Sequence, residues 1–347
     1  MIKNLKHPTW TPPEDWLQIK TIDLHTGGEP LRVFIDGLPE IRGSTILEKR
    51  RYFRDHYDYI RTGTMFEPRG HADMYGAVIT EPTTEDADFG TFFLHNEGYS
   101  TMCGHAIIAL TKLVLDTGII SKEGDEPELI INAPPGKIYA RAYREKGQVQ
   151  KISFKNVPSF LYLKDEEIHV PEIGKVKFDI AFGGAFYAFC QADSLGLKLD
   201  HSDYNRLIDY GRKIKYAVME NFPVKHPFEE DLSFLYGTIF TGRAKNPMNH
   251  SRNVCIFAEG EVDRSATGSG VSARAALHFA RKELRINERI TIESILDTTM
   301  DVEVKETTTY GTHQAVIPEV TGTAFITGQN NFYFDPDDSL KNGFIFR

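Results

Sequence analysis

The chain has 347 residues, of which 41% are hydrophobic and 26% charged, and a formal net charge of −9. This composition is typical of a globular protein of two domains, and the dispersed negative charge argues against a nucleic-acid or membrane-surface partner. No run approaches the roughly 18 apolar residues of a membrane span. Three cysteines without metal-ligand spacing argue against a disulfide framework and a metal site, and predict a reducing, cytoplasmic location.

Short apolar runs bounded by Gly and Pro predict strands, and longer periodic runs predict helices. In chain order, the expected elements are strand 31–35, helix 44–59, strands 77–80 and 90–94, helix 104–116, strands 129–132 and 176–180, helix 202–219, strand 254–258, helix 270–284, and strands 290–293 and 324–327. Helices 104–116 and 270–284 are apolar on most sides, which is typical of buried helices. One buried helix in each half predicts an α+β fold whose two domains each wrap a mostly antiparallel sheet around a central helix.

The polar stretch 163–167 is the expected domain boundary. It divides the chain into an N-terminal domain, 1–167, and a C-terminal domain, 168–335. The first contains Cys103 and the second contains Asp263 and Thr267.

Two similar segments begin the two apolar helices. Residues 100–110 read STMCGHAIIAL and residues 263–273 read DRSATGSGVSA. In each segment a side chain able to carry a proton precedes a glycine and a small or polar residue. Because a helix N-terminus lowers the pKa of a thiol, Cys103 is predicted to be a thiolate that acts as a base or a nucleophile.

The backbone of these two segments predicts a carboxylate site. The N–H groups of Gly104 and His105, and those of Gly268 and Ser269, lie at helix N-termini, where anions bind. Donors aimed at a carboxylate stabilise the charge that develops when the neighbouring carbon loses a proton. Asp263 is expected to pair with an amine of the same substrate. The predicted ligand is therefore an amino acid, and no cofactor is required.

Structural interpretations compete with this functional one. A cysteine before a buried helix is more often a packed core residue, and glycine turns are common at helix starts. The Asp263-Arg264 pair is also compatible with a surface ion pair or a turn. Cys190 and Cys255 lie in apolar stretches and are expected to fill the core.

At these residues the chain resembles the proline racemase family, and further motifs follow in that family's order. They are DLHTGGEP at 23–30, EPRGHADMYG at 67–76, HNEGY at 95–99, FKNVPSF at 154–160, DIAFGG at 179–184 and HSRN at 250–253. The resemblance extends from roughly residue 17 to residue 330. It implies two pseudo-symmetric domains of the diaminopimelate epimerase type, with the active site between them. It also implies that residues 336–347 return to the first domain.

Racemases of this family use two cysteines, and the second lies in the motif DRSPCGTG. Here the motif reads DRSATGSG, with Thr267 in place of that cysteine, which is the pattern of the family's trans-3-hydroxy-L-proline dehydratases. Ala266 and Ser269 also depart from the family motif but keep the backbone N–H donors. A threonine hydroxyl is too weak an acid to exchange protons with carbon near neutral pH, so inversion by two bases should fail. One base still suffices for elimination.

The resemblance therefore implies a cofactor-independent lyase of hydroxyproline catabolism. Cys103 would remove the Cα proton of trans-3-hydroxy-L-proline, the 3-hydroxyl would leave, and Δ1-pyrroline-2-carboxylate would form. The alternatives are a hydroxyproline epimerase or proline racemase, and a catalytically silent binding protein. Four questions stay open. They are whether Thr267 contacts the substrate, which group protonates the leaving hydroxyl, whether His25, His71 and His250 contact the substrate, and whether the chain forms a homodimer.

Overall fold

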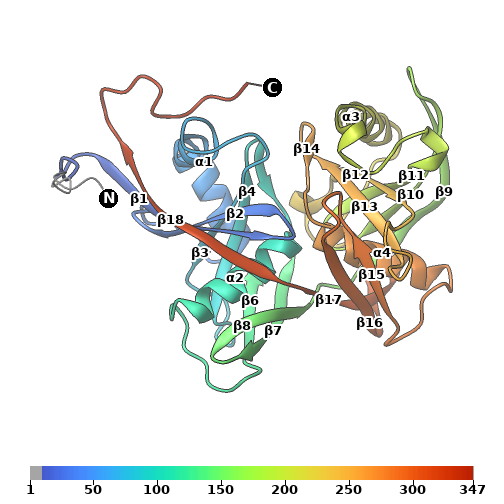
Figure 1. Cartoon of the computed structure of the whole chain (residues 1–347), viewed down its shortest axis with the longest axis horizontal. Coiled ribbons are helices and arrows are strands. Elements are labelled where there is room, and N and C mark those ends of the chain that lie inside the picture. The colour runs from blue at the N-terminus through green and yellow to red at the C-terminus, as the bar shows by residue number, and fades with distance from the viewer. Residues whose placement is uncertain (1–9, 347) are drawn as a thin grey trace, which may run out of the picture.

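The computed structural model describes residues 10–346, which fold into two lobes (Figure 1). This part of the chain contains eighteen strands, four α-helices and three 3₁₀ helices. The strands are β1 (Leu17–Thr26), β2 (Glu29–Asp36), β3 (Tyr75–Thr80), β4 (Phe89–His95), β5 (Gly98–Ser100), β6 (Glu128–Ala133), β7 (Gly136–Glu145), β8 (Gln148–Lys155), β9 (Phe160–Val170), β10 (Gly174–Phe182), β11 (Phe186–Gln191), β12 (Leu235–Gly242), β13 (Ser251–Phe257), β14 (Glu261–Val262), β15 (Arg289–Glu293), β16 (Thr299–Tyr310), β17 (His313–Gly322) and β18 (Ala324–Phe334). The helices are α1 (Ile46–Met65), α2 (Gly104–Asp116), α3 (Tyr204–Asn221) and α4 (Gly268–Ala280), and the 3₁₀ helices are Asp193–Leu195, His201–Asp203 and Glu230–Leu232.

The strand pairings of the first half recur in the second. In the first half, β1 pairs antiparallel with β2, β2 parallel with β3, and β3 antiparallel with β4, which also pairs with β5 and, in parallel, with β6. In the second half, β10 to β15 pair in the same order and with the same directions. Helices α1 and α3 follow the second strand of each repeat, and α2 and α4 follow the fifth. The fold is therefore the predicted pseudo-symmetric α+β arrangement.

The last strand of each repeat pairs with the opposite repeat. β9 pairs with β10, β18 pairs with β1, and β8 pairs with β17. Figure 1 accordingly shows β18 along the N-terminal lobe and β9 in the C-terminal lobe. The division at residue 167 stays a prediction. It falls near Val170, the end of the first repeat, whereas the pairings favour assigning β9 to the second lobe and β18 to the first. Within the expected returning segment 336–347, of which residue 347 lies outside the described residues, Phe344 forms a bridge with Glu67 of the first lobe.

Each lobe wraps its sheet around one apolar helix. Helix α2 contacts β1, β2, β7, β8 and β18, and α4 contacts β9, β10, β11, β16 and β17. Most residues of both helices are buried, because neither helix has the broad charged face that a surface helix turns to water. Helix α1, by contrast, is amphipathic and begins with a capping box formed by Thr45 and Glu48. The two central helices bring their N-termini to the contact between the lobes.

Every strand and helix predicted from the sequence overlaps an element of the structure, and these predictions are confirmed. Helix 270–284 is four residues too long, since α4 ends at Ala280 and Lys282 adopts a positive φ of 62° that no helix continues through. Within the described residues, no helix combines the length and the apolar character needed to cross a bilayer.

Candidate active site

Cys103 is the N-cap residue of α2. Its backbone is extended, with φ −140° and ψ 99°, and its carbonyl accepts a hydrogen bond from Ile107 N at 3.1 Å. Its Sγ atom lies 3.2 Å from Nδ1 and 3.6 Å from Nε2 of His105, on the first turn of the helix. The thiol is therefore buried at a helix N-terminus with an imidazole beside it.

Thr267 occupies the matching N-cap position of α4, but in a strained conformation. Its φ of 66° and ψ of 91° lie in a region that β-branched residues rarely adopt. The preceding loop imposes this conformation, because Thr267 N donates to Ser265 Oγ at 3.0 Å and Ser265 N donates to Asp263 Oδ1 at 2.7 Å. Among the described residues, the buried Oγ1 of Thr267 has no hydrogen-bond partner. Strain and an unsatisfied buried hydroxyl are both typical of functional sites.

The two helices meet through a pair of glycines. A Cβ atom placed on Gly104 would lie 2.6 Å from the Cα of Gly268, and one placed on Gly268 would lie 2.7 Å from the Cα of Gly104. Such distances are well inside van der Waals contact, so only glycine fits at either position. Both helix N-termini, with their partial positive charge, consequently converge on the same point.

A single small cavity lies at this contact, and all seven site residues predicted from the sequence line it. They are Cys103, Gly104, His105, Asp263, Thr267, Gly268 and Ser269. The other lining residues are Tyr75, Met102, Tyr187, Tyr236, Cys255 and Phe257. The space between these residues that no atom fills is about 260 Å³, including the part open to solvent.

The pKa of Cys103 is raised well above its ordinary value, and the prediction of a lowered pKa is wrong. Burial of the thiol is the largest cause, and the negative charges of Asp263 and Glu29 add to it. The Ala106 backbone N–H and the Tyr75 hydroxyl act in the opposite direction as hydrogen-bond donors to the thiolate. The sequence identifies the helix N-terminus but not the depth of burial, and here the cost of desolvating a charge exceeds the benefit of the donors.

A negative cluster faces the cavity from the Asp263 side. Buried Glu29 accepts a hydrogen bond from Arg264 N at 2.7 Å through Oε2, and its Oε1 atom has no partner among the described residues. Burial, followed by the charge of Asp263, raises the pKa of Glu29 well above its usual range. Arg264 also forms an ion pair with Asp73 of the other lobe, at 2.8 Å. An ammonium group in the cavity would relieve the repulsion between the carboxylates.

The sequence missed the aromatic and second thiol residues of the cavity. The Tyr187 hydroxyl is 2.7 Å from Ser269 Oγ, and the Tyr75 hydroxyl is 3.4 Å from that of Tyr236. These tyrosines lie in apolar strands, where a core role is the default expectation, so no sequence signal separated them from packing residues. Cys255 is buried in the core, as expected, and it also lines the cavity, because its carbonyl accepts a hydrogen bond from Asp263 N at 3.1 Å.

The three additional histidines do not line the cavity. His25 Nδ1 accepts from Gly28 N at 3.2 Å, and His71 is exposed. His250 Nδ1 lies 2.8 Å from Ser251 Oγ. Their open role in substrate contact is therefore unsupported by the geometry.

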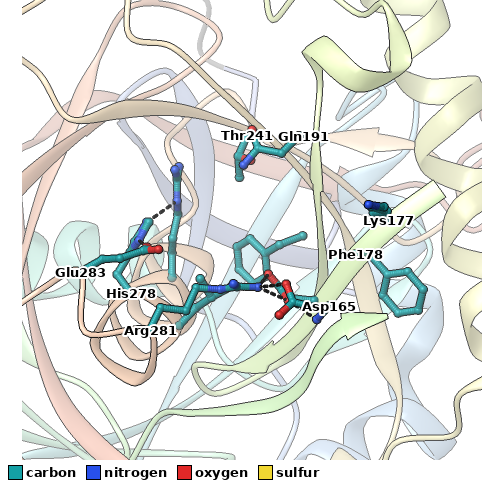
Figure 2. Close-up of a pocket in the computed structure, with 12 residues that line it drawn as sticks. Asp165, Lys177, Phe178, Gln191, Thr241, His278, Arg281 and Glu283 are labelled. Carbon is teal, nitrogen blue, oxygen red and sulfur yellow. Dashed lines mark hydrogen bonds and ion pairs between the residues drawn. The ribbon is translucent and has the colours of Figure 1, made fainter. Parts of the chain in front are cut away.

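A larger hollow lies on another side of α4, and ion pairs of Arg281 cross it (Figure 2). Arg281 is paired with Asp165 at 2.6 Å and with Asp179 at 2.7 Å. His278 lies 2.7 Å from Glu283. Figure 2 shows Arg281 directed toward Asp165 across the hollow. These pairs join α4 to the neighbouring strands, and the hollow is best explained as a structural feature.

Comparison with known proteins agrees with the resemblance in the sequence. The family described as Proline racemase matches residues 21–345. A trans-3-hydroxy-L-proline dehydratase of Colwellia psychrerythraea is 50% identical over the full length of both chains. One from Homo sapiens is 43% identical over 95% of each chain.

Solved structures give the same result for the fold. A hydroxyproline epimerase from Agrobacterium vitis, with bound trans-4-hydroxy-L-proline, superimposes with a TM-score of 0.91 at 27% identity, covering 96% of each chain. A phenazine biosynthesis protein of the PhzF family from Bacillus anthracis has a TM-score of 0.57 at 11% identity and shares only the fold. The chain belongs to the proline racemase family.

Proposed function

We propose that this chain is a hydro-lyase that converts trans-3-hydroxy-L-proline to Δ1-pyrroline-2-carboxylate without a cofactor. The observation that supports this function best is the unequal pair at the two abutting helix N-termini, a thiol at Cys103 and a hydroxyl at Thr267. Relatives that are 43–50% identical over most of their length are named for the same reaction.

The substrate carboxylate is held by backbone donors. The N–H groups of Gly104, His105, Gly268 and Ser269 converge where α2 meets α4. The ring ammonium faces Asp263. Without the ammonium, the carboxylates of Asp263 and Glu29 repel each other. Binding of the zwitterion places a positive charge near Cys103 and so lowers the pKa of its thiol, which burial and these carboxylates raise in the empty cavity.

Cys103 then removes the Cα proton. Negative charge moves onto the substrate carboxylate, toward the two helix N-termini, where fixed donors stabilise it in the transition state. In trans-3-hydroxy-L-proline the Cα hydrogen and the hydroxyl share one ring face, so the group that leaves is on the side of Cys103. The enamine product, Δ2-pyrroline-2-carboxylate, rearranges to the Δ1 imine.

Thr267 restricts proton transfer at Cα to the face of the substrate ring that Cys103 occupies. Its hydroxyl replaces the second thiol with which the family's racemases protonate the opposite face, and an alcohol is too weak an acid for that step. Elimination needs no proton donor on that face. The strained backbone of Thr267 and its unsatisfied Oγ1 place a neutral polar group there instead.

Epimerisation of a hydroxyproline is the second candidate function, and one observation favours it. Cys255 supplies a second thiol to the cavity next to the Asp263 loop, since its carbonyl accepts a hydrogen bond from Asp263 N at 3.1 Å. Burial raises the pKa of Cys255 well above its ordinary value, which keeps the thiol protonated but also makes it a weaker acid. Formation of a D-amino acid that Cys255→Ala abolishes would support this alternative.

The test of the proposed function is incubation of the purified protein with trans-3-hydroxy-L-proline and no added cofactor. Δ1-pyrroline-2-carboxylate is followed by coupled reduction to proline, with Cys103→Ser as the inactive variant and Cys190→Ser as the matched control. Cys190 is a buried thiol that does not line the cavity. Product from the wild type and Cys190→Ser, and none from Cys103→Ser, is expected. Inversion of trans-4-hydroxy-L-proline without dehydration would contradict the proposal.

A cytoplasmic location belongs to the same proposal. All three cysteines are buried and free in the structure, which suits a reducing compartment.

A further inference from the structure

The elimination leaves one chemical requirement that Cys103 does not meet directly. Hydroxide is a poor leaving group, so the departing 3-hydroxyl needs a proton at the moment when the C3–O bond breaks. The donor must lie on the ring face of Cys103, because the hydroxyl and the Cα hydrogen share that face. It must also recover its proton before the next turnover.

Tyr75 lies on the Cys103 side of the cavity. It begins strand β3 of the N-terminal lobe, lines the same cavity as Cys103, and is fully buried. Its ring packs edge-on against that of His105, with centroids 4.8 Å apart, and His105 in turn contacts Cys103 Sγ at 3.2 Å. His105 therefore touches both Tyr75 and Cys103, and the two side chains face the same small cavity.

The Tyr75 hydroxyl belongs to a buried network of hydroxyl groups. It hydrogen bonds to Ser100 Oγ and lies 3.4 Å from the hydroxyl of Tyr236, which comes from the C-terminal lobe. In the Ser100 contact either oxygen can be the donor. When Ser100 donates, the Tyr75 proton is free to point at a ligand in the cavity, which is the arrangement that a proton donor needs.

The other candidates on this face are less suitable. Burial lowers the pKa of His105, so its ring is neutral and carries a single N–H. Both ring nitrogens lie near Cys103 Sγ, Nδ1 at 3.2 Å and Nε2 at 3.6 Å, so the ring is occupied with the sulfur rather than with the leaving hydroxyl. The Tyr187 hydroxyl is engaged with Ser269 Oγ, at the carboxylate end of the cavity.

We propose that Tyr75 is a catalytic residue that protonates the leaving 3-hydroxyl and regains its proton from Cys103. The Cα–H bond breaks and its proton passes to Sγ, while the electron pair forms the double bond between Cα and C3. The C3–O bond breaks with its electron pair on oxygen, and the Tyr75 proton converts that oxygen to water. The proton on Cys103 then passes to the Tyr75 oxygen, which restores both residues.

The environment of Tyr75 favours a relay over a free phenolate. Burial raises the pKa of Tyr75 well above its ordinary value, and the charge of a Cys103 thiolate adds to this. A phenolate in this position is therefore costly, so the hydroxyl gives up a proton only as it receives another. The inference rests on the proposed dehydration and assigns the proton donor that this reaction requires.

The test is the dehydration rate of Tyr75→Phe, measured with ordinary trans-3-hydroxy-L-proline and with the same substrate deuterated at Cα. Loss of a general acid lowers kcat about 100-fold. Because departure of the hydroxyl then limits the rate, the isotope effect on kcat/KM falls toward unity. Tyr187→Phe is the matched control, and we expect it to raise KM while the isotope effect keeps its wild-type size.

The outcomes separate this inference from the proposed function. No product from the wild type contradicts the proposed function itself. Product from the wild type together with an undiminished rate in Tyr75→Phe overturns the role of Tyr75 alone. A reduced rate with the isotope effect retained also overturns it, since Tyr75 would then act only through Cys103. If Tyr75→Phe does not fold, the kcat of the wild type in H₂O is compared with its kcat in D₂O. Transfer of the Tyr75 proton to the leaving oxygen requires a solvent isotope effect on kcat, and its absence overturns the role of Tyr75.

Discussion

The glycine contact between the two central helices makes a sharp prediction for Gly104→Ala. The added methyl group would lie 2.6 Å from the Cα and 2.8 Å from the carbonyl carbon of Gly268, both backbone atoms that cannot move aside as a side chain would. The helices must therefore separate by an amount on the order of 1 Å, and a displacement of that size costs about 100-fold in rate. We expect kcat/KM for trans-3-hydroxy-L-proline to fall about 100-fold.

The global stability should change far less. Overpacking costs about 1–3 kcal/mol, whereas replacing glycine by alanine within a helix contributes about 1 kcal/mol of stability. Gly104 has no positive φ, so no backbone strain is added. The net change in the free energy of unfolding is then about 0–2 kcal/mol. The variant should fold and lose activity.

The assay is steady-state dehydration together with a urea unfolding curve for each variant. Gly328→Ala is the matched control, because a Cβ atom there meets nothing within 4 Å and its activity should equal that of the wild type. If Gly104→Ala keeps kcat/KM within about threefold of the wild type, the contact between helix N-termini does not position the substrate, and the reasoning is refuted.

Three further predictions follow from the same structure. Thr267→Cys restores an acid on the second face of the substrate ring. In D₂O this variant should form D-proline with deuterium at Cα, a product that the wild type does not form. Absence of this product after prolonged incubation would contradict the one-base interpretation. Because the pKa of Cys103 is raised, kcat/KM should increase with pH through neutrality and reach no plateau below the ordinary thiol value of about 8.5, whereas a flat profile would indicate a preformed thiolate. Glu293, ion-paired with buried Arg252 at 2.7 Å, has its pKa lowered to about 2, so Glu293→Gln should cost on the order of 3 kcal/mol near neutral pH. A carboxyl group whose pKa is lowered in the folded state contributes its full stability only above its unfolded-state pKa. The loss of stability in Glu293→Gln should therefore diminish as pH falls from about 4.5 toward 2. A difference in unfolding free energy that does not change with pH would exclude the ion pair as its source.

Local sequence signals were sufficient for the position of the site. The apolar runs after Cys103 and Thr267 predicted buried helices, and helix N-termini bind anions whichever fold surrounds them. These two facts located the cavity residues along the chain before any three-dimensional information. The N–H groups of Gly104 and Gly268 were expected to bind a carboxylate, although the sequence did not indicate that the two glycines contact each other.

Non-local properties were beyond the sequence. The exchange of β9 and β18 depends on which strand edges remain unpaired once both repeats have folded. The sequence of β9, an apolar run at 160–163 followed by a polar run at 164–167, does not indicate which strand it pairs with. The raised pKa of Cys103 likewise depends on total burial, to which residues from both lobes contribute. Tyr75 and Cys255 were missed for a related reason, since an apolar strand residue looks the same in a core and in a cavity wall.

The duplicated fold divides binding and chemistry between backbone and side chains. Both repeats present the same pair of backbone donors at a helix N-terminus, so the proposed carboxylate site is symmetric and does not depend on side chains. The proposed proton chemistry does depend on side chains, and at the N-cap positions the repeats differ both in residue and in conformation, with φ −140° at Cys103 and 66° at Thr267. A substitution at Thr267 should therefore change which product forms while it leaves KM for the carboxylate-bearing substrate nearly unchanged. We therefore expect the N-cap side chains to determine which product this scaffold forms, and the helices that follow them to determine the substrate class that it accepts.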